Sequence, residues 1–147
     1  MVWANAKKLI ISLTMIIACL FSSCGLFYAD DPAPKLLIPK IEEIESVYIG
    51  VGYGHDGIER TDEEIKQKAI AFLQSAIPTK RESVNDTPGR EVYYRFYING
   101  AEKQYLCGGY FYEDKSLFGL VSKWYYEIPY NGIYEVSKEC ALALLEK

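Results

Sequence analysis

Histidine and basic residues are scarce in this sequence. It contains one histidine, His55, and 16 lysines and arginines against 20 aspartates and glutamates. A single histidine leaves the serines and cysteines without the base and the orienting group that an activated nucleophile needs. We therefore expect no enzymatic activity, no metal site and no cofactor.

The shortage of positive charge excludes a second class of function. Removal of residues 1–23, which contain two lysines and no acidic residue, would change the net charge from −4 to −6. Nucleic-acid-binding domains need clustered lysine and arginine side chains. We therefore expect no nucleic-acid partner.

Long hydrophobic runs are absent except near the N-terminus. Lys7 and Lys8 precede an uncharged apolar run of 13 residues from Leu9 to Phe21. This length is typical of a secretory signal and is short for a helix that crosses about 30 Å of hydrocarbon. Phe21-Ser-Ser-Cys24 resembles the bacterial lipobox. The resemblance implies cleavage before Cys24 and its modification by a lipid with palmitate-type acyl chains.

Two alternatives remain open for the N-terminus. Ile16-Ile-Ala-Cys19 is a second lipobox-like stretch, and the 21 uncharged residues from Leu9 to Ala29 are just long enough for an uncleaved spanning helix. All these interpretations place the following residues outside the cell. We expect a protein at the extracytoplasmic face of the cell membrane, anchored by lipid on Cys24.

This interpretation divides the chain into three parts: a signal peptide at 1–23, a lipidated cysteine with a flexible tether at 24–35, and one domain at 36–147. The length of the domain allows one hydrophobic core and not two. Cys107 and Cys140 lie in this domain. Outside the cytoplasm they can form a disulfide, or they can be two small buried hydrophobic residues.

The first half of the domain predicts a strand followed by a helix. Ile44 to Val51 is rich in β-branched and aromatic residues, which favours a strand. Thr61 is a suitable N-cap, Glu64 can complete a capping box, and Pro78 ends the helix. The apolar face of this helix is expected to comprise Ile65, Ala69, Phe72, Leu73, Ala76 and Ile77.

The second half predicts a meander of strands. Apolar and polar residues alternate from residue 91, Asn99-Gly100 is a hairpin signal, and further strands are expected at Lys103–Tyr112 and from about Leu120 to Ile128. Ser137 is expected to cap a short C-terminal helix. The predicted fold is therefore α+β, with one long amphipathic helix packed on a mainly antiparallel sheet of about four strands.

The stretch from Gly52 to Gly57, GYGHDG, matches the glycine pattern of dinucleotide-binding loops. In such folds the glycine loop runs directly into a helix, whose free amides receive the pyrophosphate. Here three residues intervene, and the helix has a side-chain cap of its own. We therefore expect a glycine-rich turn after the first strand and no nucleotide partner.

Tyrosine is abundant, with 13 residues that all follow Cys24. Tyrosine favours strands and half-buried positions, but a group of exposed tyrosines is typical of binding surfaces. We expect a binding surface on one face of the sheet, formed by Tyr93, Tyr97, Tyr110, Tyr112, Trp124, Tyr126 and Tyr130. The alternative is a small extracytoplasmic enzyme or metal-binding protein that uses His55, Asp56 and Cys107, which requires the three side chains to converge.

Two stretches carry a family resemblance: Ser83-Val-Asn-Asp-Thr-Pro88, and the segment from Trp124 to Glu135, WYYEIPYNGIYE. With the lead-in Leu37-Ile-Pro-Lys40, they resemble a family of small Gram-positive lipoproteins that carry a domain of unknown function. The resemblance implies a lipoprotein with an α+β fold and implies no activity.

These observations favour a non-enzymatic binding or interaction module at the cell envelope. Its expected partner is an envelope protein or cell-wall glycan, in addition to the membrane that holds its lipid. A purely structural envelope protein without a specific ligand is an alternative that the sequence does not separate from the binding module.

Overall fold

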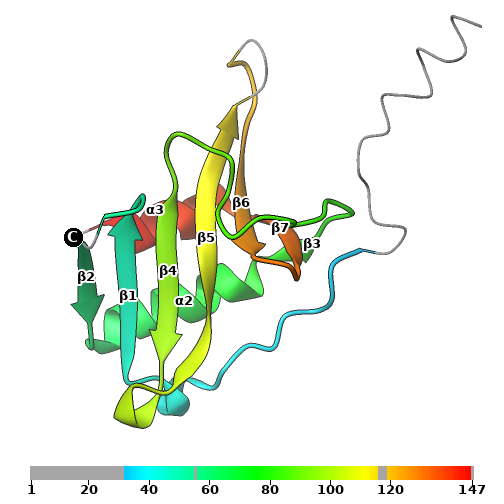
Figure 1. Ribbon diagram of the computed structural model, residues 1–147. Coiled ribbons are helices and arrows are strands. Elements are labelled where there is room, and N and C mark those ends of the chain that lie inside the picture. The colour runs from blue at the N-terminus through cyan, green and yellow to red at the C-terminus, as the bar shows by residue number, and fades with distance from the viewer. Residues whose placement is uncertain (1–31, 55, 116–118, 147) are drawn as a thin grey trace, which may run out of the picture.

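A single antiparallel sheet of seven strands forms the protein, in the order β2-β1-β4-β5-β6-β7-β3 (Figure 1). The computed structural model describes residues 32–54, 56–115 and 119–146. The strands are β1 (Ser46–Val51), β2 (Gly57–Arg60), β3 (Ile77–Pro78), β4 (Tyr94–Asn99), β5 (Tyr105–Lys115), β6 (Ser122–Ile128) and β7 (Gly132–Val136). Short 3-10 turns, η1 (Ile41–Glu43) and η2 (Ala101–Lys103), lie at one end of the sheet.

Two helices, α2 (Glu63–Gln74) and α3 (Lys138–Leu145), cover one face of this sheet (Figure 1). The N-cap of α2 is Asp62, whose carboxylate accepts a hydrogen bond of 3.1 Å from the amide of Ile65. The predicted cap at Thr61 was therefore wrong by one residue. The predicted cap of α3 is confirmed, because the hydroxyl of Ser137 accepts a hydrogen bond from the amide of Cys140.

The core lies between the helices and the sheet and is centred on Phe72 of α2. The centroid of its ring lies 5.2 Å from that of Phe96, 5.3 Å from that of Phe111 and 5.4 Å from that of Tyr126. All four side chains are fully buried. Burial of aromatic side chains at such distances is a large hydrophobic contribution to the stability of the domain.

The predicted fold class was wrong in its architecture, although an α+β composition agrees with the structure. The sheet has seven strands, not about four, and the principal helix has 12 residues and ends at Gln74, well before Pro78. The strands that the sequence did not predict are β2, β3 and β7, of four, two and five residues. Ile77 belongs to β3, where it pairs with Glu135, and is 66% exposed.

The described residues of the GYGHDG stretch lie at the tip of a hairpin, and Gly57 is the first residue of β2. The tip connects β1 and β2, which pair in an antiparallel register, and Gly52 has a φ of +57°. The left-handed backbone at this position favours glycine. The predicted glycine-rich turn is confirmed, and the chain enters the antiparallel strand β2 before it reaches α2.

The N-terminal part of the described chain packs against the sheet. The amide of Ala33 donates a hydrogen bond of 2.9 Å to the carbonyl of Thr79, and the hydroxyl of Tyr134 donates one of 2.6 Å to the carbonyl of Pro34. These contacts involve residues that the sequence analysis assigned to the tether. Cys19 and Cys24 lie outside the described residues.

The connection between β3 and β4, residues 79–93, crosses the face of the sheet opposite to the helices (Figure 1). We call it the cover segment. The guanidinium of Arg81 lies 4.6 Å from the ring centroid of Tyr125 in β6, and that of Arg90 lies 5.4 Å from the ring centroid of Tyr112 in β5. The cover segment therefore shields the β5–β6 part of this face.

Candidate functional site

The uncovered part of the helix-free face carries a group of tyrosines around one arginine. Tyr48 of β1, Tyr97 of β4 and Tyr110 of β5 are half-buried, and Arg95 of β4 lies among them. The register pairs Tyr48 with Tyr97 and Arg95 with Tyr110. With Tyr105, these residues form what we call the aromatic face.

A β-bulge brings Tyr105 to this face. The register shifts between Ile98 and Asn99, so that Ile98 pairs with Cys107 but Asn99 pairs with Tyr105. The extra residue reverses the alternation of side chains along the strand. Tyr105 is 58% exposed, and its ring centroid lies 6.3 Å from that of Tyr97.

Two glycines allow the tyrosine rings to lie flat on the sheet. A Cβ atom at Gly57 would overlap the ring of Tyr48, and one at Gly108 would come within 2.5 Å of the ring of Tyr97. Any side chain at either glycine would push the ring upward, because protein atoms do not approach so closely. Each ring therefore lies against a glycine, and both side chains remain partly exposed.

Arg95 is a half-buried cation without a hydrogen bond or an ion pair among the described residues. Its Nε and Nη2 atoms are buried and make no hydrogen bond within the described residues, and its guanidinium lies 5.5 Å from the ring centroid of Tyr48. Burial raises the pKa of the neighbouring Tyr110 to about 12, so its hydroxyl stays neutral at physiological pH. The aromatic face is thus an uncharged surface with one cation in it.

The structure places the predicted binding residues in several different environments. Tyr97 and Tyr110 belong to the aromatic face, and Tyr130 is 68% exposed in the turn between β6 and β7. Trp124 and Tyr126 point to the helices and are buried in the core, so their assignment to the surface was wrong. The β6 alternation puts both on the helix side because each pairs with a core-facing residue of β7.

Tyr93 and Tyr112 lie on the helix-free side of the sheet but are buried, with exposed fractions of 2% and 1%. The guanidinium of Arg90 lies over the ring of Tyr112, and the rings of Tyr53 and Tyr110 flank that of Tyr93. Their assignment to an exposed surface was therefore also wrong. The sequence could not reveal this burial, because it depends on the path of the cover segment.

A buried carboxylate holds the cover segment to the sheet. Glu127 of β6 is 6% exposed and accepts hydrogen bonds from the hydroxyls of Ser83, at 2.7 Å, and Tyr112, at 3.0 Å. Burial and the neighbouring Glu127 carboxylate raise the pKa of Tyr112 well above its usual range, so Tyr112 remains a donor. Buried carboxylates need such donors to offset their lost hydration.

This carboxylate joins the two stretches that carried the family resemblance in the sequence. Ser83 begins the first stretch, and Glu127 lies in the second. A second connection runs between Asp86 and Tyr130, where a hydrogen bond with the carboxylate raises the pKa of the tyrosine. The two stretches therefore form one structural unit.

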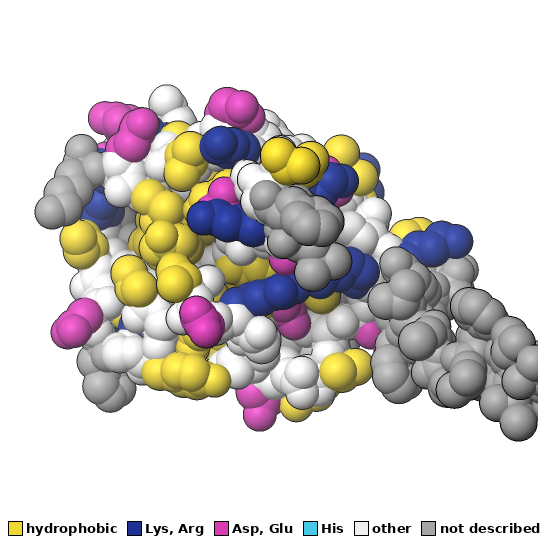
Figure 2. All heavy atoms as spheres, turned by 90° about the horizontal axis from the view of Figure 1, so that it is seen from above, with side chains coloured by type: hydrophobic (Ala, Val, Ile, Leu, Met, Phe, Trp, Pro, Cys, Tyr) yellow, Lys and Arg dark blue, Asp and Glu magenta, His cyan; other side chains and the backbone are white. Residues whose placement is uncertain are grey.

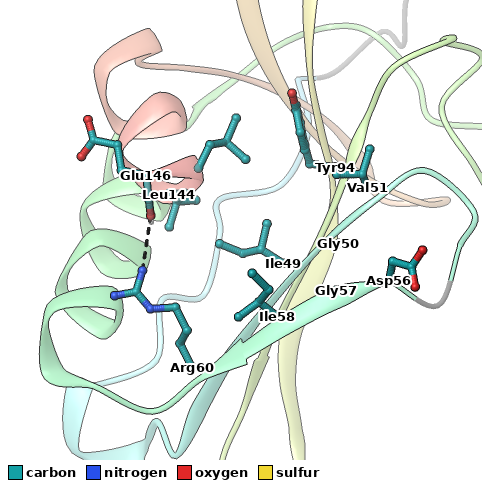
Figure 3. Close-up of a pocket in the computed structure, with 11 residues that line it drawn as sticks. Ile49, Gly50, Val51, Asp56, Gly57, Ile58, Arg60, Tyr94, Leu144 and Glu146 are labelled. Carbon is teal, nitrogen blue, oxygen red and sulfur yellow. Dashed lines mark hydrogen bonds between the residues drawn. The ribbon is translucent and has the colours of Figure 1, made fainter.

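An apolar cleft lies at the end of the molecule, between α3 and the ends of β1, β2 and β4. It has a volume of about 640 Å³, and its apolar lining comprises Ile49, Val51, Ile58, Tyr94, Leu144 and Leu145 (Figure 3). Figure 2 looks onto this end and shows hydrophobic side chains gathered in a hollow. At the rim, Arg60 is paired with Asp62 at 3.0 Å and donates to the carbonyl of Glu146. We call this hollow the end cleft.

The structure separates two residues of the alternative enzyme or metal site. Asp56 precedes Gly57 at the β2 edge of the sheet, whereas Cys107 lies on β5 and pairs with Ile98. The two positions are three strands apart, roughly 14 Å. Burial raises the pKa of Cys107 to about 11, which disfavours the reactive thiolate. His55 lies outside the described residues.

The cysteines and acids of the described chain form no further cluster. Cys107 and Cys140 are both free and partly buried against the core, as small hydrophobic residues would be. Within residues 32–54, 56–115 and 119–146, no three metal-binding side chains come together.

Sequence reasoning missed Tyr48, Tyr105 and Arg95 as members of the site. The alternation of Tyr93, Arg95 and Tyr97 already placed the arginine on the side of the strand opposite Phe96. Tyr48 follows the same rule in the first strand. The position of Tyr105 depends on the bulge. The pair Gly108-Gly109 indicates a bulge or bend in this strand but does not place it between Tyr105 and Cys107.

A comparison with protein-family models identifies the domain. The DUF5301 family model, described as "Domain of unknown function (DUF5300)", matches residues 32–135. The chain belongs to this family. The matched DUF5301 residues span all seven strands except the last residue of β7, and α3 follows them.

One solved structure supports the fold of the DUF5301 domain. The NMR structure of a protein from Ruminococcus gnavus matches with a TM-score of 0.53 and 25% sequence identity. The aligned region covers 74% of the present chain and 98% of the Ruminococcus gnavus chain. No curated protein matches the chain.

The buried carboxylate of this DUF5301 domain generates a prediction about stability. Ser83→Ala and Tyr112→Phe each remove one donor from Glu127, and each should lower the free energy of unfolding by about 1–3 kcal/mol, measured by urea denaturation. The double variant should lose more than the sum of the two, because the carboxylate then stays buried without a donor.

Tyr125→Phe is the matched control, because its hydroxyl makes no hydrogen bond to another described residue. It should change the free energy of unfolding by less than about 0.5 kcal/mol. An equally small change for Ser83→Ala would show that this bond does not hold the cover segment.

Proposed function

We propose that this DUF5301 protein is a non-enzymatic binding module, held at the outer face of the cell membrane by a lipid on Cys24. Its aromatic face binds an envelope partner, which is a protein or a cell-wall glycan. The observation that carries the proposal is the unpaired Arg95 surrounded by tyrosine rings on a face that the helices leave uncovered. Grouped aromatic side chains with a charged neighbour are typical of recognition surfaces.

The aromatic face is a stronger candidate than the end cleft for a specific partner. In the cleft, Arg60 is already paired with Asp62, and the remaining lining is mostly aliphatic. On the aromatic face, the buried nitrogens of Arg95 lack any partner within the described chain. The guanidinium therefore carries a charge that no acidic side chain of the described residues neutralises, and an anionic ligand at its remaining nitrogen would supply the missing counter-charge.

The proposed anchor rests on the N-terminal sequence. The described residues contain no helix that is long and apolar enough to cross a membrane. The lipobox-like stretch before Cys24 and the resemblance to small Gram-positive lipoproteins support a lipid anchor. The acyl chains hold such a protein stably at the bilayer when two or more are attached.

The anchor is tested by membrane fractionation of cells that produce the full chain. Wild type should remain with the membrane and partition into detergent, whereas Cys24→Ala should lose the acyl chains and accumulate as an unprocessed precursor. Cys19→Ala is the matched control and should behave as wild type. Loss of lipid in Cys19→Ala instead would move the anchor to the earlier cysteine, and normal lipid labelling of both variants would refute the proposal.

The binding surface is tested by photo-crosslinking in intact cells. A benzophenone amino acid at position 105 lies on the aromatic face, one at position 51 lies at the end cleft, and one at position 67 is on the exposed side of α2. We expect a specific adduct from position 105 and none from position 67. An adduct that forms from position 51 alone would assign binding to the end cleft and contradict the proposal.

A further inference from the structure

Of the arginines on the helix-free side of the sheet, all but one pair with an acidic side chain. Arg81 and Arg90 of the cover segment both contact the carboxylate of Asp114, at 3.6 Å and 2.8 Å. Lys123 contacts that of Glu135 at 2.8 Å. Arg95, at the centre of the aromatic face, has no acidic side chain within ion-pair distance among the described residues.

The guanidinium of Arg95 has one nitrogen that a ligand can reach. Nε and Nη2 are buried. Nη1 keeps some exposure and makes no hydrogen bond to the described residues. Guanidinium groups match the geometry of carboxylates and form their strongest hydrogen bonds with them. The electrostatic complement of the aromatic face is therefore a negatively charged group at its centre.

The tyrosine rings beside Arg95 are arranged for stacking. The centroids of Tyr48 and Tyr97 are 5.8 Å apart with an angle of 32° between the rings, and Tyr105 continues the row. The C–H bonds on the apolar side of a sugar ring carry a slight positive charge and are attracted to the electron-rich face of an aromatic ring. Neighbouring rings along this row can therefore receive successive sugars of a chain.

The flat position of the rings argues against a protein as the ligand. Aromatic side chains that dominate protein interfaces act as anchors, which fill pockets of the partner. Tyr48 and Tyr97 lie against Gly57 and Gly108 and do not project in this way.

We propose that the ligand of the aromatic face is an extended anionic glycan, whose sugar rings stack on Tyr48, Tyr97 and Tyr105 and whose carboxylate pairs with Arg95. This inference rests on the proposed function, because it names the ligand of the same face. It predicts that charge and stacking contribute separately, so that each can be removed without the other.

Calorimetric titration of the full chain in detergent tests the inference with two probes. The first is a β-linked hexasaccharide of glucuronate, and the second is cellohexaose, which has the same linkage and lacks the carboxylates. Wild type should bind the glucuronate probe about tenfold more tightly, the preference expected from a charge-assisted hydrogen bond. The preference should decrease as salt is added.

Variants separate the contribution of charge from that of stacking. Arg95→Gln should lose the preference for glucuronate and keep the affinity for cellohexaose, whereas Arg95→Lys should retain part of the preference. Arg81→Gln removes a cation that is already paired with Asp114 and should leave both affinities unchanged. Tyr97→Leu should weaken both probes to a similar extent. Thermal unfolding of each variant distinguishes these effects from a loss of folding.

Equal affinity of wild type for the two probes would overturn the inference, as would an equal loss of preference in Arg81→Gln and Arg95→Gln. If neither probe bound, the proposal that the ligand is a glycan would be wrong. If position 105 then captures a defined protein in cells, the proposed function stands with a protein partner. If position 105 captures nothing either, the proposed function fails together with the inference.

Discussion

The sheet is aromatic on both faces, but the helices cover only one of them in the described structure. On the helix side, Phe72 fills the centre of a core that a short helix can close. The opposite face therefore has to be covered by other means. The cover segment shields its β5–β6 part, and the tyrosine rings of β1 and β4 shield Gly57 of β2 and Gly108 of β5. The position of the candidate site follows from this division.

The tyrosines of the helix-free face consequently have two different roles. Beneath the cover segment, Tyr112 acts structurally, because it donates to the buried Glu127 and keeps the cover segment in place through Ser83. Outside the cover segment, Tyr48 and Tyr97 lie against glycines and remain partly exposed. The same residue type thus stabilises one half of the face and offers a surface on the other half.

The sequence predicted the long elements that have a strong local pattern. It did not predict features that depend on the pairing of distant strands or on the path of a distant segment. The strand alternation around Phe96 and the cap at Ser137 were visible in local patterns. The two-residue strand β3 exists only through its pairing with β7, and the burial of Tyr112 exists only through the cover segment. Trp124 and Tyr126 were misassigned because β6 carries aromatic residues on both faces, so alternation did not identify the buried side.

Oxidative footprinting of the tyrosines by hydroxyl radicals, read by mass spectrometry, tests most directly whether the aromatic face is open. Tyr48, Tyr97 and Tyr105 should be oxidised in the folded protein, whereas Tyr112 and Tyr126, which are 1% and 0% exposed, should be protected until the protein unfolds. Protection of Tyr48 and Tyr97 equal to that of Tyr126 would contradict the account. Oxidation of Tyr112 as rapid as that of Tyr105 would contradict it as well, because the cover segment would then not cover the sheet.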